Sequence, residues 1–281
     1  MAEIRAADVA KLRKLTGAGM MDCKKALEEC DGDMDAAKDR LRTKGLAGAT
    51  KRAGRAAEQG TVDVIAEGNV GALVELVCET DFVAKSAEFV ELVHALTEMV
   101  VAEPNSGLEL NPFGDSTVGE TITQLGAKLG ENVALGRIAR FESAGGIVDG
   151  YKHMQNNRGT IGVLVDLAGV DASDPKAREL AHDLALHIAS AAPRYLSRED
   201  VPADVVAGER AVFEELTRNE GKPEQAWPKI VEGRLGGFYK DNVLLEQGFV
   251  KEPKTTIKSL VDGFGGGATV RQFIRVKIAE D

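Results

Sequence analysis

Apolar and polar residues alternate in two stretches of the chain that have nearly the same sequence. The first, GNVGALVEL, occupies residues 68–76, and the second, GTIGVLVDL, occupies residues 159–167. Each follows another extended segment, TVDVIAE (residues 61–67) or IVDGYKHM (residues 147–154), after a glycine-containing turn. Alternation on both sides of such a turn is typical of a β-hairpin, so the sequence predicts two hairpins.

Each predicted hairpin is followed by a helix and then by a third strand. Helical spacing of apolar residues covers residues 88–104 and 177–193, and strand-like segments follow at residues 136–142 and 272–280. The order strand, strand, helix, strand therefore occurs twice. It predicts an α+β protein with a duplicated core of two small antiparallel-sheet modules. We expect these modules at residues 56–145 and at residues 146–198 together with 240–281.

Three short helices are predicted in an N-terminal module, residues 1–55. The breaks TGAG (residues 16–19) and DGD (residues 31–33) end the first two helices, and the third is predicted to stop at Gly45. Three such helices bury little apolar surface, so the module is expected to be only marginally stable by itself. The following stretch, AGATKRAGRAAEQG (residues 47–60), predicts a solvated connection that begins as a helix.

A helical hairpin is predicted as an insert in the second module, at residues 199–239. Its first arm carries an apolar stripe of Val205, Val212 and Leu216, and a second stripe follows after the turn sequence NEGKPEQ. Two amphipathic helices joined in this way form an antiparallel coiled-coil hairpin that projects from the sheet. Pro223 in this turn suits the first position of the second helix. Pro228 would remove a hydrogen bond and clash inside a helix, so a start of the second arm at Pro228 is the alternative.

The composition excludes several classes of function. The chain has 281 residues, of which 43% are hydrophobic and 28% charged, enough for roughly two domains with a real core. A formal net charge of −10 and an aromatic content of 5% argue against direct binding of nucleic acid. No apolar run approaches the ~20 residues of a membrane span, and the charged N-terminus is no signal peptide. We therefore expect a cytoplasmic protein without membrane contact.

Residues for catalysis or metal binding do not cluster in the sequence. The three cysteines form no CxxC pair and predict reduced thiols, and the four histidines include no HExxH motif. The glycine-rich segment DGFGGGATV (residues 262–270) precedes a predicted strand, so it lacks the helix N-terminus that phosphate-binding loops use. We expect no catalytic residue, no resident metal and no cofactor.

One connection between a predicted strand and a predicted helix carries an apolar ring that neither element requires. In CETDFVAKSAEF (residues 78–89), the apolar face of the helix begins at Phe89, with Ser86 as its predicted N-cap. Thr80 can cap a separate short turn that carries Asp81 and Phe82. The residues alone leave two alternatives: Phe82 packs into its own core, as phenylalanine commonly does, or it contacts another molecule.

Several long segments resemble those of one protein family, bacterial elongation factor Ts. The segments are KLRKLTGAGMMDCKKALEECDGDMDAAKDRLRTKG, ETDFVAKSAEF, GENVALGRIARFE, HIASAAPRYL and GKPEQAWPKIVEGRL. They occur in the family's order and extend nearly from end to end. The resemblance implies a guanine nucleotide exchange factor for the translational GTPase elongation factor Tu, without catalytic chemistry of its own. It also implies a ubiquitin-associated-like (UBA-like) N-terminal module, a duplicated core and a coiled-coil hairpin.

The resemblance further implies a role for the turn after residue 79. In this family the matching turn inserts into the GTPase domain of elongation factor Tu, beside the magnesium and phosphate site. We therefore expect Thr80, Asp81, Phe82 and Val83 to form the exchange wedge. Magnesium demands a near-ideal octahedral shell. A small displacement of the groups that hold its waters would therefore weaken the binding of the metal, and then the binding of the diphosphate.

Other positions match partner contacts of the family. Leu129 and His153 match residues that support the wedge, whereas Arg13, Met20 and Met21 match the face of the N-terminal module that grips the GTPase domain. Internal packing is the alternative for the two methionines.

Two further expectations concern the molecule as a whole. Some family members continue past the last strand into a further helix that contacts elongation factor Tu. This sequence ends at VKIAED, so we expect that contact to be absent. A non-catalytic adaptor that uses the UBA-like module alone is the alternative function, and it requires nothing of the Asp81–Phe82 turn. The sequence does not predict an oligomeric state.

Overall fold

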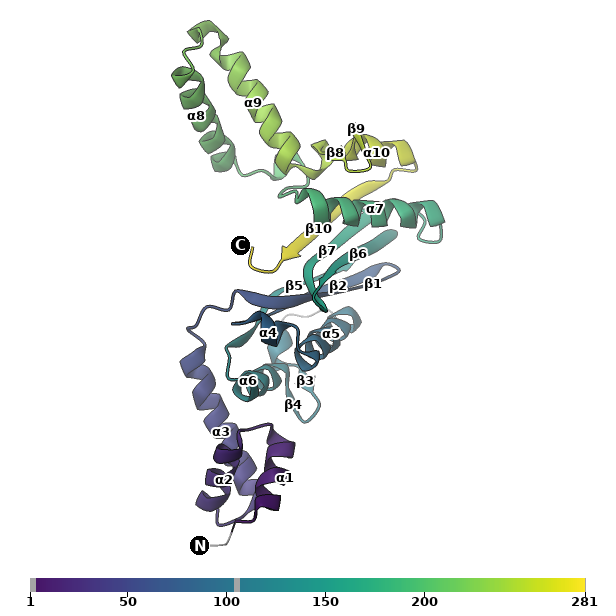
Figure 1. Ribbon diagram of the computed structural model, residues 1–281. Helices are drawn as coiled ribbons and strands as arrows, with labels where there is room; N and C mark the ends of the chain where they lie inside the picture. Colours follow the sequence, from purple (N-terminus) through teal and green to yellow (C-terminus); the bar gives the residue numbers. More distant parts are fainter. Residues whose placement is uncertain (1–3, 104–106, 281) are drawn as a thin grey trace.

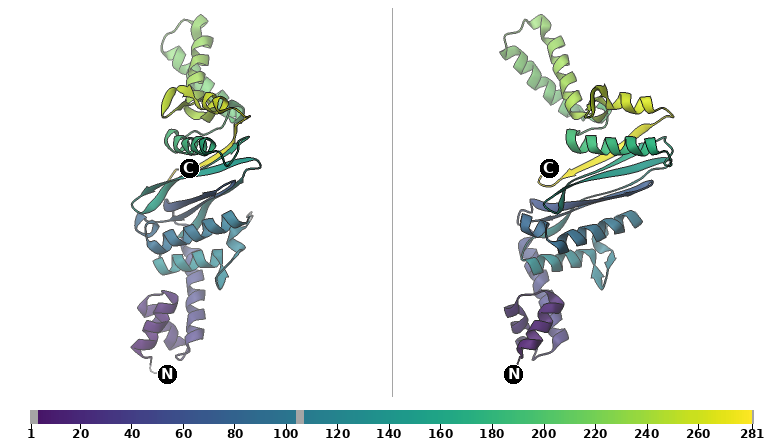
Figure 2. Two further views of the ribbon diagram at one scale, coloured as in Figure 1. Left: turned by 90° about the vertical axis from the view of Figure 1, so that its right-hand side faces the viewer. Right: turned by 45° about the vertical axis from the view of Figure 1, so that its right-hand side comes forward.

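The described part of the chain is elongated, with three helices at one end and a helical hairpin at the other (Figure 1). The computed structural model describes residues 4–103 and 107–280, so Pro104, at the end of one predicted helix, lies outside the described residues. Between the two ends lie two three-stranded antiparallel sheets with helices on their outer faces (Figures 1 and 2). This arrangement confirms the predicted α+β class.

The N-terminal helices pack around a small apolar core that includes Leu12, Cys23 and Leu27. Their bounds are α1 Ala6–Thr16, α2 Met20–Glu29 and α3 Met34–Arg52. The expected stop at Gly45 is wrong, because α3 continues to Arg52 and forms the start of the connection to the sheets.

Packing against another helix explains why α3 passes through Gly45. A Cβ on residue 45 would stand 3.2 Å from the Cβ of Ala127 in α6 (Val118–Leu129), so glycine allows the two helices to approach closely. Arg42 and Glu120 add an ion pair at 2.7 Å between the same helices. Glycine inside a helix costs about 1 kcal/mol relative to alanine, and this contact offsets that cost.

The first sheet has the strand order β1-β2-β5, with helices on its outer face (Figure 1). The predicted hairpin is confirmed, with Gln59 opposite Cys78 and Glu67 opposite Val70. Along β2, Ala72, Val74 and Leu76 pack against the helices. The bounds are β1 Gln59–Glu67, β2 Val70–Cys78, α4 Asp81–Ala84, α5 Ala87–Ala102, η1 Leu108–Leu110, β3 Pro112–Phe113, β4 Ser116–Thr117 and β5 Val133–Glu142.

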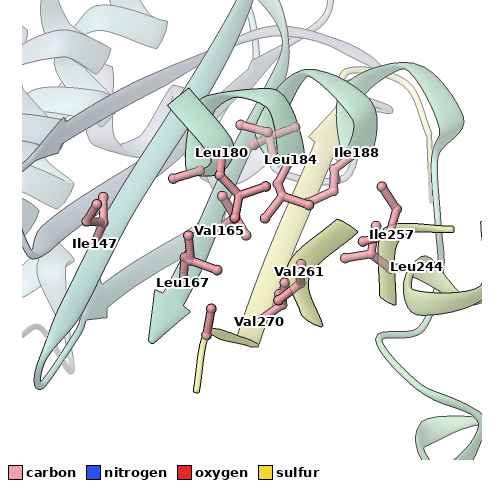
Figure 3. Close-up of a cluster of buried hydrophobic side chains, with 14 of the residues drawn as sticks. Ile147, Val165, Leu167, Leu180, Leu184, Ile188, Leu244, Ile257, Val261 and Val270 are labelled. Carbon is pink, nitrogen blue, oxygen red and sulfur yellow. The ribbon is translucent and has the colours of Figure 1, made fainter. Parts of the chain in front are cut away.

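The second sheet has the order β10-β7-β6 and confirms the second predicted hairpin, with Ile147 opposite Leu167. Leu184 and Ile188 of α7 pack over Val165 and Leu167 of β7 (Figure 3). The bounds are β6 Gly146–Gln155, β7 Arg158–Ala168, α7 Pro175–Ala191, η4 Leu244–Glu246, β8 Gly248–Phe249, β9 Glu252–Thr256, α10 Ile257–Phe264 and β10 Thr269–Lys277.

The two sheets pack face to face through a separate apolar layer (Figure 2). Gly71 and Gly162 occupy the same place in the two repeated segments, and both approach the opposite sheet. A Cβ on Gly71 would stand 2.6 Å from Cγ1 of Val148, and one on Gly162 would stand 2.6 Å from Cγ2 of Val62. Glycine at this position of the repeat therefore sets how closely the sheets approach. The buried residues of the layer are Val62, Leu73, Val148, Leu164, Val276 and Ile278.

The inserted hairpin projects beyond the second sheet (Figure 1). Its elements are η2 Arg198–Asp200, α8 Ala203–Asn219, η3 Glu224–Ala226 and α9 Trp227–Asn242. Pro228 lies in the first turn of α9, where its missing N–H costs no intrahelical bond, so the second arm begins there and the start at Pro223 is wrong. The apolar stripe predicted on the first arm is wrong in part as a buried face, because Val212 and Leu216 are about half exposed. Thr217, one position along, is the buried residue of α8.

Candidate partner-binding site around Phe82

A short helix connects the first hairpin to α5 and carries the Asp81–Phe82 pair. Thr80 is the N-cap of α4, and its hydroxyl oxygen accepts a bond from the N–H of Val83 at 3.4 Å, as the sequence predicts. Ser86 is the N-cap residue of α5, although its hydroxyl donates to the carbonyl of Val83 at 2.8 Å instead of capping α5. The Thr80 cap and the bond from Ser86 to Val83 thus fold the connection into one turn between β2 and α5.

The two apolar residues of this turn have opposite environments. Val83 is 8% exposed and packs in the core between the first sheet and its helices. Phe82 is 73% exposed and does not pack into that core. Val83 therefore anchors the turn, while the ring of Phe82 projects from it. An exposed phenylalanine beside a rigid anchor is a candidate contact for another molecule.

Lys85 contacts both Asp81 and Phe82, which was not predicted from the sequence. Its Nζ lies 3.2 Å from Oδ2 of Asp81, one helical turn earlier, and 4.3 Å from the centroid of the Phe82 ring. The ammonium therefore holds the carboxylate and the ring on one side of the turn. Such i,i+4 pairs and cation–π contacts are each worth about 0.3–1 kcal/mol when exposed. The spacing of Asp81 and Lys85 was the available clue.

Glu131, on the loop after α6, binds the two residues that precede Asp81, which are Glu79 and Thr80. Its Oε2 accepts bonds from the backbone N–H groups of Glu79 and Thr80, both at 3.0 Å. Its Oε1 accepts the hydroxyl hydrogen of Thr80 at 2.5 Å. No local pattern in the sequence predicts this contact, because Glu131 lies about 50 residues from its partners.

Cys78 lies beneath the same turn and stays protonated. Its Sγ–H donates to the carbonyl of Thr80 at 3.2 Å. Burial, and next the negative charge of Glu131, raise the pKa of the Cys78 thiol to about 12. A thiol with such a pKa is neither a nucleophile nor a metal ligand at neutral pH. Cys78 thus contributes packing and one hydrogen bond to the site.

The remaining predicted site residues lie in three places. Leu129 is partly buried against the helix-covered core and ends α6, close to Glu131. His153 is exposed near the end of β6, where its Nδ1 lies 3.0 Å from the hydroxyl of Tyr151. The turn after β6 lies near the end of the first sheet from which the Phe82 turn leaves. There Arg158 donates to the carbonyl of Gly60 at 2.8 Å, and Gly60 pairs with Val77 of β2.

On the N-terminal helices, Arg13, Met20 and Met21 are all exposed, so internal packing does not account for the two methionines. Leu15 of α1 is exposed as well. The turn before Met20 approaches α6, because a Cβ on Gly17 would stand 2.6 Å from the side chain of Lys128. The N-terminal helices and the Phe82 turn therefore flank the same end of α6.

Within residues 4–103 and 107–280, no group of three or more His, Cys, Asp or Glu side chains has the arrangement of a metal site. In the same residues, no helix is long and apolar enough to span a membrane. The site around Phe82 offers a projecting ring, a carboxylate and an ammonium, which suit contact with a protein partner.

Comparison with known proteins points to one family. The family model described as Elongation factor TS matches residues 79–280, which include the Phe82 turn and Glu131. The chain is 47% identical to elongation factor Ts of Micrococcus luteus, over 99% of each chain. It is 49% identical to elongation factor Ts of Mycobacterium avium and 47% identical to that of Mycobacterium tuberculosis, over 100% of each chain.

Proposed function

The chain belongs to the elongation factor Ts family of translation factors, and we propose that it binds the GDP-bound GTPase elongation factor Tu and promotes release of the GDP. In this proposal the Asp81–Phe82 turn enters the GTPase near its magnesium and phosphate site. GTP then loads onto the emptied partner. The exchange takes place in the cytoplasm with the rest of translation, and no nucleic acid contact is required.

The observation that carries the proposal is the exposure of Phe82. A ring that is 73% exposed on a capped and anchored turn can be buried in a partner without unfolding its own domain. Full burial of such a side chain contributes about 1.5–3 kcal/mol. That free energy is available only in the state of the partner that accepts the ring, so it can favour the nucleotide-free GTPase over the GDP-bound one.

The wedge acts on the metal before it acts on the nucleotide. Magnesium requires six ligands in near-ideal octahedral geometry, so displacement of one supporting group weakens the binding of the ion. The diphosphate then loses its charge compensation and leaves faster. The chain carries out no bond-making chemistry in this mechanism, so it is an exchange factor and not an enzyme.

The other predicted contacts have supporting roles. Leu129 and His153 contact the same GTPase helices beside the wedge, and Arg13, Met20 and Met21 add affinity from the N-terminal helices. The shared position of these helices and the wedge at one end of α6 supports simultaneous contact with a single partner.

Stopped-flow release of fluorescent GDP from elongation factor Tu, chased with excess unlabelled GDP, tests the proposal. We expect the release rate to rise with the concentration of the chain and to reach a plateau. Binding without acceleration would instead support the adaptor that uses the UBA-like helices alone. The proposed function is wrong if saturating chain leaves the GDP release rate unchanged.

A further inference from the structure

Phe82 raises a physical problem that its anchoring by Val83 does not solve. An exposed aromatic ring gains free energy by covering any apolar surface within reach. On a loose turn, the ring would fold back onto its own domain and be unavailable to a partner. A projecting Phe82 therefore requires that the backbone before it be held rigidly.

We propose that Glu131 is the positioning residue that holds the Asp81–Phe82 turn in its projecting conformation, and that stimulated GDP release depends on it. This inference rests on the proposed function and names a residue that acts through Phe82 without touching the partner's nucleotide. Its carboxylate meets three donors at once, from the N–H groups of Glu79 and Thr80 and from the Thr80 hydroxyl.

These bonds fix the start of α4 in one orientation. The Thr80 hydroxyl gives its hydrogen to Glu131 and accepts the N–H of Val83 with its oxygen. The rotamer of Thr80 is therefore set by a bond on each side. Since Val83 follows Phe82 directly, the backbone is held on both sides of the ring, by Glu131 at Thr80 before it and by the core contact of Val83 after it.

Glu131 itself stands on a rigid support. The helix α6 ends at Leu129 and is followed by the C-cap Gly130, which has a φ of 77°, and the N–H of Glu131 donates to the carbonyl of Gly126 at 3.1 Å. A Cβ on Gly126 would stand 2.9 Å from the carbonyl oxygen of Glu131, so glycine there lets the loop fold tightly onto the helix. This helix end fixes the position from which the carboxylate reaches the turn.

A second set of bonds runs in the opposite direction. Oε1 of Glu79 accepts the N–H of Asn132 at 2.6 Å, while Glu131 accepts the N–H of Glu79. Arg55, at the end of the connection from the N-terminal helices, donates to Glu79 at 3.3 Å and accepts the side-chain amide of Asn132 at 2.9 Å. The two loops thus bind each other reciprocally, and Glu131 accepts three of the bonds between them.

Amide hydrogen exchange of the unbound chain tests the positioning role directly. In Glu131→Ala we expect the exchange rates of the Glu79 and Thr80 amides to rise at least tenfold. Glu131→Gln keeps one acceptor oxygen for the two backbone donors, so its rates should lie between those of the wild type and Glu131→Ala. Glu142→Ala is the matched control, because Glu142 lies at the opposite end of the sheet, paired with Val70 instead of Cys78.

The GDP release plateau tests the consequence for exchange. We expect Glu131→Ala to lower the plateau about tenfold, equal to about 1.4 kcal/mol, with Glu131→Gln in between and Glu142→Ala unchanged. In a Phe82→Ala background, Glu131→Ala should lower the plateau by clearly less than tenfold, since it acts through the turn that carries the ring and only the contribution of Asp81 remains. A merely structural role would lower the plateau by the same factor in both backgrounds, and that result would overturn the proposal.

Unchanged exchange of the Glu79 and Thr80 amides in Glu131→Ala would also overturn it. Should Glu131→Ala fail to fold, as judged by its melting transition, the milder Glu131→Gln decides by the same two measurements. If the wild-type chain does not accelerate GDP release at all, the proposed function fails. The amide exchange then still decides whether Glu131 holds the turn.

Discussion

Phe82 and Phe89 lie seven positions apart in the sequence and behave as opposites. Phe82 is 73% exposed, whereas Phe89 is fully buried in the core between the first sheet and α5. We expect Phe82→Ala to leave the melting transition unchanged and to lower the GDP release plateau about 10- to 100-fold, from the loss of about 1.5–3 kcal/mol of burial in the partner. Phe89→Ala is the control, since it should destabilise the fold by about 3–5 kcal/mol.

Residual exchange per folded molecule separates the two outcomes for Phe82. If Phe82→Ala unfolds the chain and the folded fraction keeps its full activity, Phe82 is a core residue and the wedge lies elsewhere. Asp81→Ala should also slow release. Its effect should not add fully to that of Phe82→Ala, because Lys85 contacts both side chains and the two share one small site.

His187 is a fully buried residue whose neutral form the fold requires. The N–H of Val250 donates to Nδ1 at 3.3 Å, so the proton resides on Nε2, which donates to Oε1 of Gln247 at 2.9 Å. Burial lowers the pKa of His187, and the bond to Gln247 opposes this only in part. The contribution of the neutral ring to stability is therefore complete above the ordinary histidine pKa of about 6.5. It is lost as the pH falls toward the lower pKa of the folded state.

Urea unfolding at several pH values checks this. We expect the stability difference between the wild type and His187→Gln to be constant above about pH 6.5 and to shrink below it, by at most about 1.4 kcal/mol per pH unit. His182→Gln is the control, because the His182 side chain is about half exposed; its Nδ1 lies 3.1 Å from Oδ1 of Asp149. If the difference in unfolding free energy between the wild type and His187→Gln does not change with pH, the fold does not require the neutral form of the buried ring.

Among the elements, the closeness of the two sheets depends on one glycine in each repeat. We expect Gly162→Ala to destabilise the fold by about 1–3 kcal/mol, because its Cβ would stand 2.6 Å from Val62 and 2.9 Å from Leu73 in a packed layer. Gly233→Ala in α9 meets no atom within 4 Å and should stabilise the fold by about 0.5–1 kcal/mol. Equilibrium urea unfolding measures both. Equal effects at the two positions would mean that the sheets separate to accept the methyl group.

At the scale of the whole molecule, the exchange proposal requires reciprocal coupling between the chain and GDP. The factor by which the chain weakens GDP binding to the partner must equal the factor by which GDP weakens binding of the chain. We expect at least a tenfold factor in both directions, measured by calorimetry with GDP-bound and nucleotide-free elongation factor Tu. Phe82→Ala should reduce both factors alike. If it weakens binding to the two forms of the partner equally, Phe82 supplies affinity and not exchange.

The sequence by itself determined the two β-hairpins, the helix that follows each of them and the two arms of the insert, whereas α6 and α10 were not predicted. Alternation around glycine turns located both β-hairpins, and helical spacing located α5, α7 and the two arms of the insert, because these patterns depend on neighbours a few residues apart. The capped turn at Thr80 was predictable for the same reason. The family resemblance then pointed to Phe82 as a partner contact, which residue type alone left open.

The tertiary structure decided how those elements use their surfaces. It continued α3 through Gly45 because Ala127 packs against it, and it turned α8 so that Thr217 is buried instead of Val212. It also brought Glu131 to Thr80 across 51 residues. Periodicity and capping record only local neighbours, whereas these contacts depend on where distant segments meet in space. For that reason the projecting ring was foreseeable, but the carboxylate that supports it was not.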